Sequence, residues 1–268
     1  MTLAKLPTIA VEKPWGVVGL PGPFASSSDE RIGEIWFDPP PDCPLLAKYL
    51  FTSERLSIQV HPDDAEARAR GEASGKEECW FILEAEPGAK LGIGTVRPLG
   101  GAELRAAALS GAIEELIEWH PVEPGMFFHV PPGTVHAIGG GISLVEIQQK
   151  SDVTYRLYDY GRPRELHLED GAAVARAVPM PASLQRMISA DQSIRLLAGT
   201  RLSVAYIAGN DLGPIASDNG PLLIVPLKGS VEVDSVSVGA GECLWGARAA
   251  SIAAAGDARF LVAGQGGP

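Results

Sequence analysis

Glycine and proline divide this chain into short segments, and this division is what most constrains its fold. The 268 residues include 31 glycines and 22 prolines. Between them lie runs rich in β-branched and other apolar residues, for example residues 56–60, 126–130, 221–227 and 230–238. Short strands separated by frequent turns are typical of β-sandwiches and β-barrels. We therefore expect an all-β fold with a few helices.

Two segments predict helices, and a third predicts a linker. Asp63 and Asp64 open a polar run, and acidic residues suit a helix N-terminus because they cap free N–H groups and face the positive end of the helix dipole. The stretch 101–119 is the clearest helix, since apolar residues recur on one face. The interval from about 171 to 193 predicts a connector. We therefore expect two domains, at residues 1–180 and 181–268.

The composition limits the classes of partner. The net charge of −11 argues against a nucleic-acid binder, which needs positive charge to attract phosphate. Cys43, Cys79 and Cys243 are far apart and odd in number, which favours free thiols in a reducing compartment. We see no export signal and no apolar run long enough to span a bilayer. We expect a soluble cytoplasmic protein without a nucleic-acid or membrane partner, as a monomer or weak homodimer.

Four polar side chains lie in or beside strand-like runs: Gln59, His61, Glu78 and His136. Gln59 and His61 are two residues apart, so on a strand their side chains share a face. His136 follows a Pro-x-Gly turn, which places it at a strand start near a barrel mouth. A carboxylate, two imidazoles and an amide oxygen suit a divalent metal such as zinc. A lone histidine at a strand end is more often simply hydrogen-bonded or exposed, and the remaining histidines receive that interpretation.

The arrangement of these residues resembles the cupin superfamily. Residues 125–136 read G-x5-P-x-G-x2-H, like the second cupin motif. The first cupin motif, H-x-H followed by a glutamate, is represented by Gln59-x-His61 and then Glu78, so a glutamine replaces the first histidine. The resemblance implies two cupin-like jelly-roll β-barrels, with the metal site in the first and no metal ligands in the second.

Further segments resemble the type I mannose-6-phosphate isomerases, in particular their short bacterial form. They are KPWG at 13–16, IGEIW at 32–36, LSIQVHPDD at 56–64, GKEECWFIL at 75–83, PPGTVHAIGGG at 131–141 and EIQQKSDVTYRLYDYGR at 146–162. The resemblance covers most of the first 170 residues. It implies that mannose 6-phosphate and fructose 6-phosphate are interconverted with one Zn²⁺ per chain, and that Gln59, His61, Glu78 and His136 are its ligands.

The same resemblance implies roles for other residues. Ser57 and Lys76 match positions near the substrate, and we expect Lys76 to contact the phosphate. Arg162 falls near a family basic residue that would also meet the phosphate. Glu146 and Arg156 match active-site positions. An aldose–ketose isomerisation passes through a cis-enediol(ate), whose negative charge Arg156 could stabilise because guanidinium stays protonated. Glu146 and a metal-bound hydroxide are the two candidates for the general base.

Two other functions compete with this interpretation. A cupin with open coordination positions could hold Fe(II) and act as an oxygenase; the glutamine ligand, Lys76 and Arg156 argue against it. A non-catalytic cupin could bind a sugar phosphate as a sensor; this chain shows no recognisable DNA-binding or signalling module, which argues against that alternative.

Overall fold

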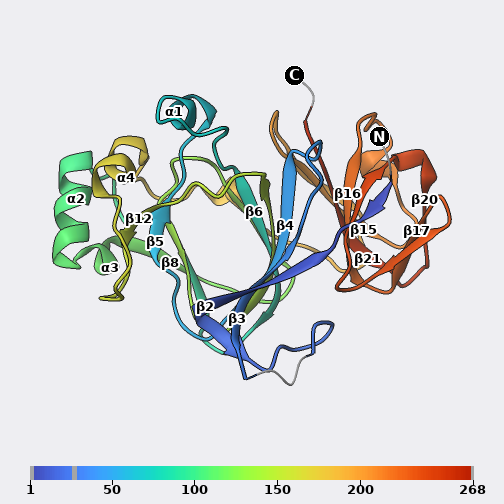
Figure 1. Ribbon diagram of the computed structural model, residues 1–268, viewed down its shortest axis with the longest axis horizontal. Helices are drawn as coiled ribbons and strands as arrows, with labels where there is room; N and C mark the ends of the chain where they lie inside the picture. The colour runs from blue at the N-terminus through green and yellow to red at the C-terminus, as the bar shows by residue number, and fades with distance from the viewer. Residues whose placement is uncertain (1–2, 26–28, 267–268) are drawn as a thin grey trace.

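The strands form four sheets that are arranged as two lobes (Figure 1). The computed structural model describes residues 3–25 and 29–266. The first lobe pairs a seven-stranded with a five-stranded sheet, and the second pairs a six-stranded with a three-stranded sheet. The predicted all-β fold with a few helices and two cupin-like barrels is confirmed. In the part of the chain that the structure describes, no helix combines the length and apolar character needed to cross a membrane.

The two sheets of the first lobe face each other across the interior of the first barrel. The seven-stranded sheet has the order β13 (Gln185–Met187), β9 (Met126–Val130), β6 (Glu78–Ala85), β11 (Ile142–Gln149), β4 (Leu45–Thr52), β3 (Arg31–Phe37) and β2 (Thr8–Val18). The five-stranded sheet has the order β12 (Tyr155–Tyr158), β5 (Ile58–Val60), β10 (His136–Ile138), β7 (Lys90–Thr95) and β8 (Ile117–Pro121).

The second lobe contains the remaining strands. Its larger sheet runs β1 (Ala4–Lys5), β19 (Leu244–Ala247), β16 (Leu222–Lys228), β21 (Arg259–Gly264), β15 (Ser203–Ala208) and β14 (Ile194–Ala198). Its smaller sheet runs β18 (Val236–Gly239), β17 (Ser230–Val233) and β20 (Ile252–Ala254). Two pairings cross residue 180, because β1 joins the second lobe and β13 pairs with β9 of the first.

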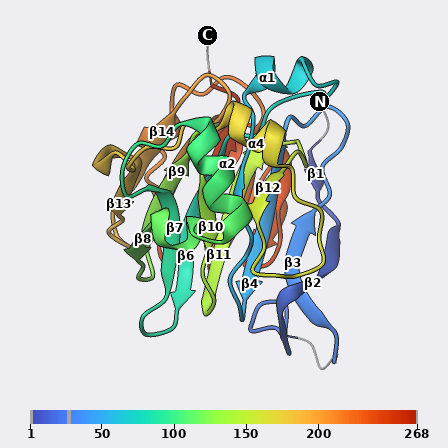
Figure 2. The ribbon, with the colours of Figure 1, turned by 90° about the vertical axis from the view of Figure 1, so that its left-hand side faces the viewer.

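In the described residues, four helices flank the first lobe: α1 (Asp64–Arg68), α2 (Gly101–Ser110), α3 (Ile113–Leu116) and α4 (Leu168–Val174). Figure 2 shows α2 and α4 in front of the five-stranded sheet. The same residues also form short 3-10 turns at Ala182–Leu184, Gly213–Ile215 and Ala249–Ser251. The predicted helix start after Asp63 is confirmed, since its carboxylate accepts hydrogen bonds from the amides of Ala65 and Glu66.

Two expectations about these segments were wrong. The predicted helix 101–119 is broken, because Gly111 adopts φ 80°, a left-handed conformation that ends α2, and residues 117–119 enter strand β8. The expected connector from 171 to 193 holds the end of α4, a 3-10 turn and β13 instead. In both places, pairing with a distant strand decides the outcome.

Strand alternation divides the seven-stranded sheet into two faces. Cys79 and Phe81 of β6 and Val145 and Ile147 of β11 pack in one core with residues of the second lobe. The ring of Phe81 stacks on Tyr206 of β15 at 5.6 Å between centroids. The residues between them point the other way, into the first barrel. The two lobes therefore share a hydrophobic core on one face of this sheet, and the other face carries the polar residues of the site.

Candidate metal site and its pocket

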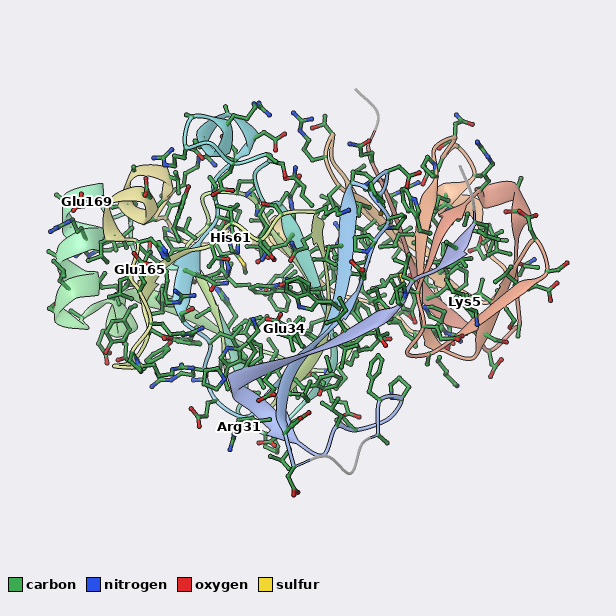
Figure 3. The ribbon with its side chains drawn as sticks, viewed as in Figure 1. Lys5, Arg31, Glu34, His61, Glu165 and Glu169 are labelled. Atoms are coloured by element: carbon green, nitrogen blue, oxygen red, sulfur yellow. The ribbon has the colours of Figure 1, made fainter. Side chains whose placement is uncertain are left out.

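The five-stranded sheet brings one row of polar side chains together. Gln59 of β5 lies opposite His136 of β10 in the strand register, and it lies opposite Arg156 of β12 on its other side. His61 follows the end of β5 and shares the face of Gln59, since two residues separate them. Figure 3 shows His61 inside the first barrel. A single row of side chains on neighbouring strands therefore places Gln59, His136 and Arg156 next to one another.

The facing sheet contributes a second row. In register across β3, β4, β11 and β6 lie Trp36, Lys48, Glu146 and Trp80. Glu78 precedes Trp80 by two residues and lies on the same face. His61, Glu78 and His136 converge between the sheets, with one ligand atom of each lying within 4.8 Å of the others. All three are buried, with exposed fractions of 2% or less.

The hydrogen bonds of the two histidines orient their Nε2 lone pairs toward the point where the three side chains converge. His61 Nδ1 lies 2.8 Å from the carbonyl oxygen of Val153, and His136 Nδ1 lies 2.9 Å from that of Thr134. A carbonyl only accepts, so each Nδ1 carries the proton and each Nε2 carries a lone pair when the ring is neutral. This is the usual arrangement of metal-binding histidines, whose other nitrogen donates to a carbonyl.

The pKa values of both rings agree with the neutral form. Burial is the main cause that lowers the pKa of His136, to about 4. Burial also lowers the pKa of His61 well below its ordinary value, and the nearby charge of Lys76 adds to the effect. Both imidazoles are therefore neutral at pH 7 and able to bind a metal.

The Glu78 carboxylate completes the group of three potential metal ligands. Its Oε1 lies 3.3 Å from His136 Nε2, and its Oε2 lies 3.6 Å from His61 Nε2. Neither oxygen makes a geometrically acceptable hydrogen bond, although Oε2 lies 2.7 Å from Lys76 Nζ. Burial raises the Glu78 pKa to about 7. Lys76 Nζ lies 3.3 Å from His61 Nε2, and Gln59 Nε2 lies 3.3 Å from His136 Nε2, so both lone pairs face a donor in this structure. Two neutral imidazoles and a carboxylate whose ligand atoms lie this close together are the ligand types that zinc takes, so the residues fit a divalent metal ion.

Gln59 stands beside this group with its amide in a definite orientation. Its Oε1 accepts a hydrogen bond of 3.1 Å from Ser57 Oγ, and its Nε2 lies 3.3 Å from His136 Nε2. The oxygen and nitrogen of a glutamine amide exchange places by a 180° turn. After that turn the oxygen would face the acceptors described above, which is the orientation that a fourth ligand needs.

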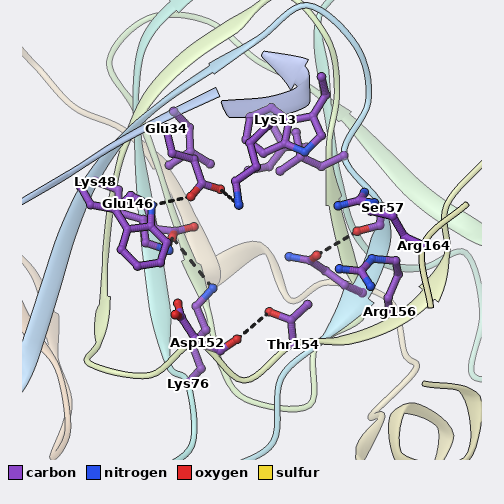
Figure 4. A pocket seen from close by; sticks show the side chains of 16 residues that line it. Lys13, Glu34, Lys48, Ser57, Lys76, Glu146, Asp152, Thr154, Arg156 and Arg164 are labelled. Carbon is purple, nitrogen blue, oxygen red and sulfur yellow. Dashed lines mark hydrogen bonds and ion pairs between the residues drawn. The ribbon is translucent and has the colours of Figure 1, made fainter. Parts of the chain in front are cut away.

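A pocket of about 340 Å³ lies beside the three ligands, and their neighbours Gln59 and Lys76 line it (Figure 4). Lys13, Glu34, Lys48 and Glu146 form one wall, and Ser57, Arg156 and Arg164 form the wall across from it. Most of its basic side chains already have carboxylate partners, since Lys13 pairs with Glu34, Lys48 with Glu146, Lys76 with Glu78 and Arg164 with Asp159.

Arg156 differs from the other pocket cations. Among the residues that the structure describes, no carboxylate oxygen lies within ion-pair distance of its guanidinium. Its Nη1 donates to the carbonyl oxygen of Glu165 at 2.8 Å, and its buried Nε has no hydrogen-bond partner. Burial lowers its pKa, and the neighbouring Arg164 lowers it further. An anion in the pocket would relieve both the unpaired donor and the repulsion between the two guanidinium groups.

Lys76 lies at the metal-ligating group itself. Its Nζ is 3.3 Å from His61 Nε2 and 3.9 Å from Glu146 Oε1, besides its contact with Glu78. Burial alone would lower the Lys76 pKa, but the charges of Glu146 and Glu78 outweigh burial and raise it. Burial likewise opposes ionisation of Glu146, but Lys76 and Lys48 lower its pKa to about 2. Both groups are therefore charged at neutral pH.

The structure brings together every predicted site residue except one. Gln59, His61, Glu78, His136, Ser57, Lys76, Glu146 and Arg156 lie at the site or line its pocket. Arg162 does not line the pocket: its guanidinium lies 3.5 Å from Asp159 and donates to the carbonyl oxygen of Arg55, while Arg164 takes the pocket position.

Sequence reasoning missed Lys48 and left Lys13 and Glu34 without a role. Lys48 lies in β4, where all eight residues are buried. A lysine inside a fully apolar run is rarely buried without a partner, and that was the available signal. The remaining histidines are hydrogen-bonded, as expected: His120 to the carbonyl oxygen of Ile93, His129 to Glu77, and His167 to the amide of Arg156.

Comparisons with known proteins agree with these features. No family model matches the chain. A mannose-6-phosphate isomerase of Streptococcus mutans is 43% identical over 154 residues, which are 53% of this chain and 48% of the relative. The chain spans about half the length of the curated relatives that it matches first.

Solved structures match over nearly the whole chain. The crystal structure of a mannose 6-phosphate isomerase from Bacillus subtilis superposes with a TM-score of 0.81 at 26% identity, covering 98% of this chain and 100% of that one. A zinc-bound mannose 6-phosphate isomerase superposes with a TM-score of 0.71 at 14% identity, covering 99% and 100%, and at this identity it shows the fold. The predicted resemblance to mannose-6-phosphate isomerases is confirmed.

Proposed function

We propose that this chain is a zinc-dependent aldose–ketose isomerase that interconverts mannose 6-phosphate and fructose 6-phosphate. The observation that carries the proposal is the convergence of three buried acceptors, His61, Glu78 and His136, beside a pocket in which Arg156 has no carboxylate partner among the described residues. The relatives at about 40% identity carry the name of this activity, and a structural neighbour is titled as zinc-bound.

The ligand set of the proposal is Gln59, His61, Glu78 and His136, with one zinc ion per chain. When bound, the zinc supplies a Lewis acid that polarises the substrate oxygens near the reacting carbons. His61, Glu78 and His136 are the two-histidine, one-carboxylate set of many catalytic zinc sites, and Gln59 would be an additional fourth ligand. The competing Fe(II) oxygenase and the non-catalytic sensor gain no support from the relatives named above.

The chain's own charged residues divide the remaining work. Arg156 lies beside Gln59 in the sheet register, so its guanidinium can meet the negative charge that develops on the enediolate oxygens. Glu146 is ionised and remains one of the two candidates for the general base, although a pKa near 2 makes it a weak one. Lys48 and Lys76 hold this carboxylate in place.

For the phosphate we revise the expected contacts. Lys76 lies so close to His61 and Glu78 that its ammonium group would meet oxygens near the reacting carbons rather than the phosphate at the far end of the sugar. Ser57 and Arg164 line the wall with Arg156. We therefore assign the phosphate to Ser57 and Arg164, with Arg164 in place of Lys76 and Arg162.

We propose that residues 1–180 carry catalysis and that residues 181–268 supply no metal ligand. We also propose that the protein acts in the cytoplasm on a small sugar phosphate, as a monomer or weak dimer.

The test combines metal removal with a proton-exchange assay. A strong chelator is expected to abolish turnover of mannose 6-phosphate, and added zinc is expected to restore it. In deuterated water, the product should carry deuterium, because the C2 proton is removed during the reaction. Full activity of a metal-free preparation would refute zinc dependence, and oxygen consumption or binding without exchange would favour the two competing functions.

A further inference from the structure

We propose that Arg201, which belongs to the C-terminal lobe, is a positioning residue for the metal site of the N-terminal lobe. The inference rests on the proposed function, because it takes His61, Glu78 and His136 as metal ligands. Arg201 lies in the turn between β14 and β15, and its side chain reaches across to the first lobe. It acts through three successive sets of contacts, of which its own ion pair is the first.

The first contact is an ion pair between the lobes. Arg201 Nε lies 2.8 Å from Asp64 Oδ2. The Arg201 side chain is about half exposed, whereas that of Asp64 is 13% exposed. Asp64 is the first residue of α1 and follows His61 by three positions. The partner of Arg201 is therefore a nearly buried carboxylate at the end of the segment that carries a predicted ligand.

The second contact crosses from this segment to the one that carries Glu78. Asp64 Oδ1 accepts hydrogen bonds from the amide of Gly75 at 2.9 Å and from Gln149 Nε2 at 3.0 Å. Because these two bonds use one carboxylate oxygen, the other oxygen is left for Arg201. The guanidinium thus fixes the orientation of a carboxylate that links two separate parts of the site.

The third contact fixes the start of β6. Gln149 Oε1 accepts a hydrogen bond from the amide of Glu77 at 2.9 Å, and the amide of Gln149 donates to the carbonyl oxygen of Glu77 at 3.0 Å. The amide of Lys76 donates to the carbonyl oxygen of Pro62 at 3.0 Å. Residues 75–77 are thereby held on each side of Lys76 and directly before Glu78.

Close packing limits how far residues 75–77 can move relative to residues 62–64. A Cβ atom at Gly75 would lie 2.4 Å from the backbone carbon of Asp63, so the backbones of the two segments touch. The second lobe holds the Arg201 backbone in place relative to the first lobe, because its six-stranded sheet shares a core with β6 and β11. A small shift of the 75–77 segment would move both Lys76 and Glu78 relative to His61.

The experiment compares Arg201→Ala and Arg201→Lys with a matched control, Arg105→Ala. Arg105 is similarly exposed and pairs with Glu169 through its Nε at 2.5 Å, away from the site. Zinc affinity is measured by competition with a chromophoric chelator, and amide hydrogen exchange of residues 75–77 is measured in the metal-free protein. Loss of a hydrogen-bonding partner of a ligand typically weakens metal binding 10- to 100-fold.

Arg201 does not contact a ligand directly but acts through Asp64 and Gln149. We therefore expect Arg201→Ala to weaken zinc binding about 3- to 10-fold, less than the loss of a direct partner would. We also expect faster exchange at residues 75–77, partial recovery of both readouts with Arg201→Lys, and no change with Arg105→Ala. Zinc affinity and exchange equal to those of Arg105→Ala would overturn the inference, even if Arg201→Ala lowered the melting temperature. A wild-type protein that binds no zinc would refute the proposed function, and the exchange measurement would still decide the role of Arg201.

Discussion

At the scale of single residues, the site is a set of charges and lone pairs whose positions are fixed by burial. The acceptors of His61, Glu78 and His136 face one another, and Lys76 lies beside them. The ligand types could be predicted from the sequence, because Gln59, His61, Glu78 and His136 occur together in the order of the cupin motifs. The position of Lys76 beside the ligands could not, because its contacts with His61 and Glu146 depend on how the fold brings these segments together.

The raised pKa of Glu78 gives a prediction about zinc binding and pH. Below pH 7 the metal-free carboxyl carries a proton, which zinc must displace, while His136 with a pKa of about 4 is already neutral. We expect close to one proton released per zinc at pH 6 and far less at pH 8, so zinc affinity falls as the pH is lowered. Calorimetry in buffers of different ionisation enthalpy measures this number; equal release at both pH values would contradict it.

Arg156 is expected to act in catalysis and not in zinc binding. Arg156→Ala is expected to keep zinc affinity within about 3-fold of wild type and to lower kcat by about 10²- to 10³-fold, because a donor to the developing oxyanion is lost. Arg156→Lys should recover only part of the rate, since one ammonium replaces a planar fork of donors. Steady-state kinetics separates the alternatives: a raised KM with unchanged kcat would instead assign Arg156 to the phosphate.

At the scale of elements, an interruption in the pairing of β2 with β3 positions one wall of the pocket. The register between these strands is broken from Glu12 to Val17, so the KPWG segment leaves the ladder. Lys13 then meets Glu34 at 3.5 Å, and Trp15 is buried in the barrel core. A Cβ at Gly33 would lie 2.6 Å from Lys13 Cβ and 2.7 Å from the Trp15 ring. The glycine is what allows this close approach.

Gly33→Ala is therefore expected to destabilise the protein by about 1–3 kcal/mol, the usual cost of inserting an atom into a packed interior. It should also raise KM, because Lys13 and Trp15 must move out of the pocket wall. Gly220→Ala serves as the control, since nothing lies within 4 Å of a Cβ there. Denaturant unfolding compares the two variants, and equal stability would show that β2 can shift without cost.

At the scale of the whole molecule, the two lobes behave as one packed body in the described residues. The core that joins them contains Phe81 of the first lobe and Tyr206 and Trp245 of the second. Tyr49 Oη of β4 donates to the carbonyl oxygen of Pro226 in β16 at 3.1 Å. Such an interface makes the C-terminal lobe a support for the sheet that carries Glu78 and Glu146.

We predict that Tyr206→Ala costs about 3–5 kcal/mol and lowers the stability of both lobes together, because it removes a buried ring from their shared core. The measurement uses the Trp245→Phe background, in which tryptophan fluorescence reports on the first lobe alone, since the other four tryptophans lie there. Fluorescence and circular dichroism should then give coincident unfolding curves. Separate transitions would show that the lobes unfold independently.

The local features can be predicted from the chain alone: the short strands, the cap at Asp63, and the types and order of the residues that converge at the site. These depend on strand alternation and turn chemistry, which act over a few residues. Three outcomes depend on the fold instead: residues 117–121 pair with β7, Arg164 rather than Arg162 lines the pocket, and Lys48 and Lys76 flank Glu146. They depend on which distant segments the fold brings together, and the energy of a buried charge depends on the partner that lies near it.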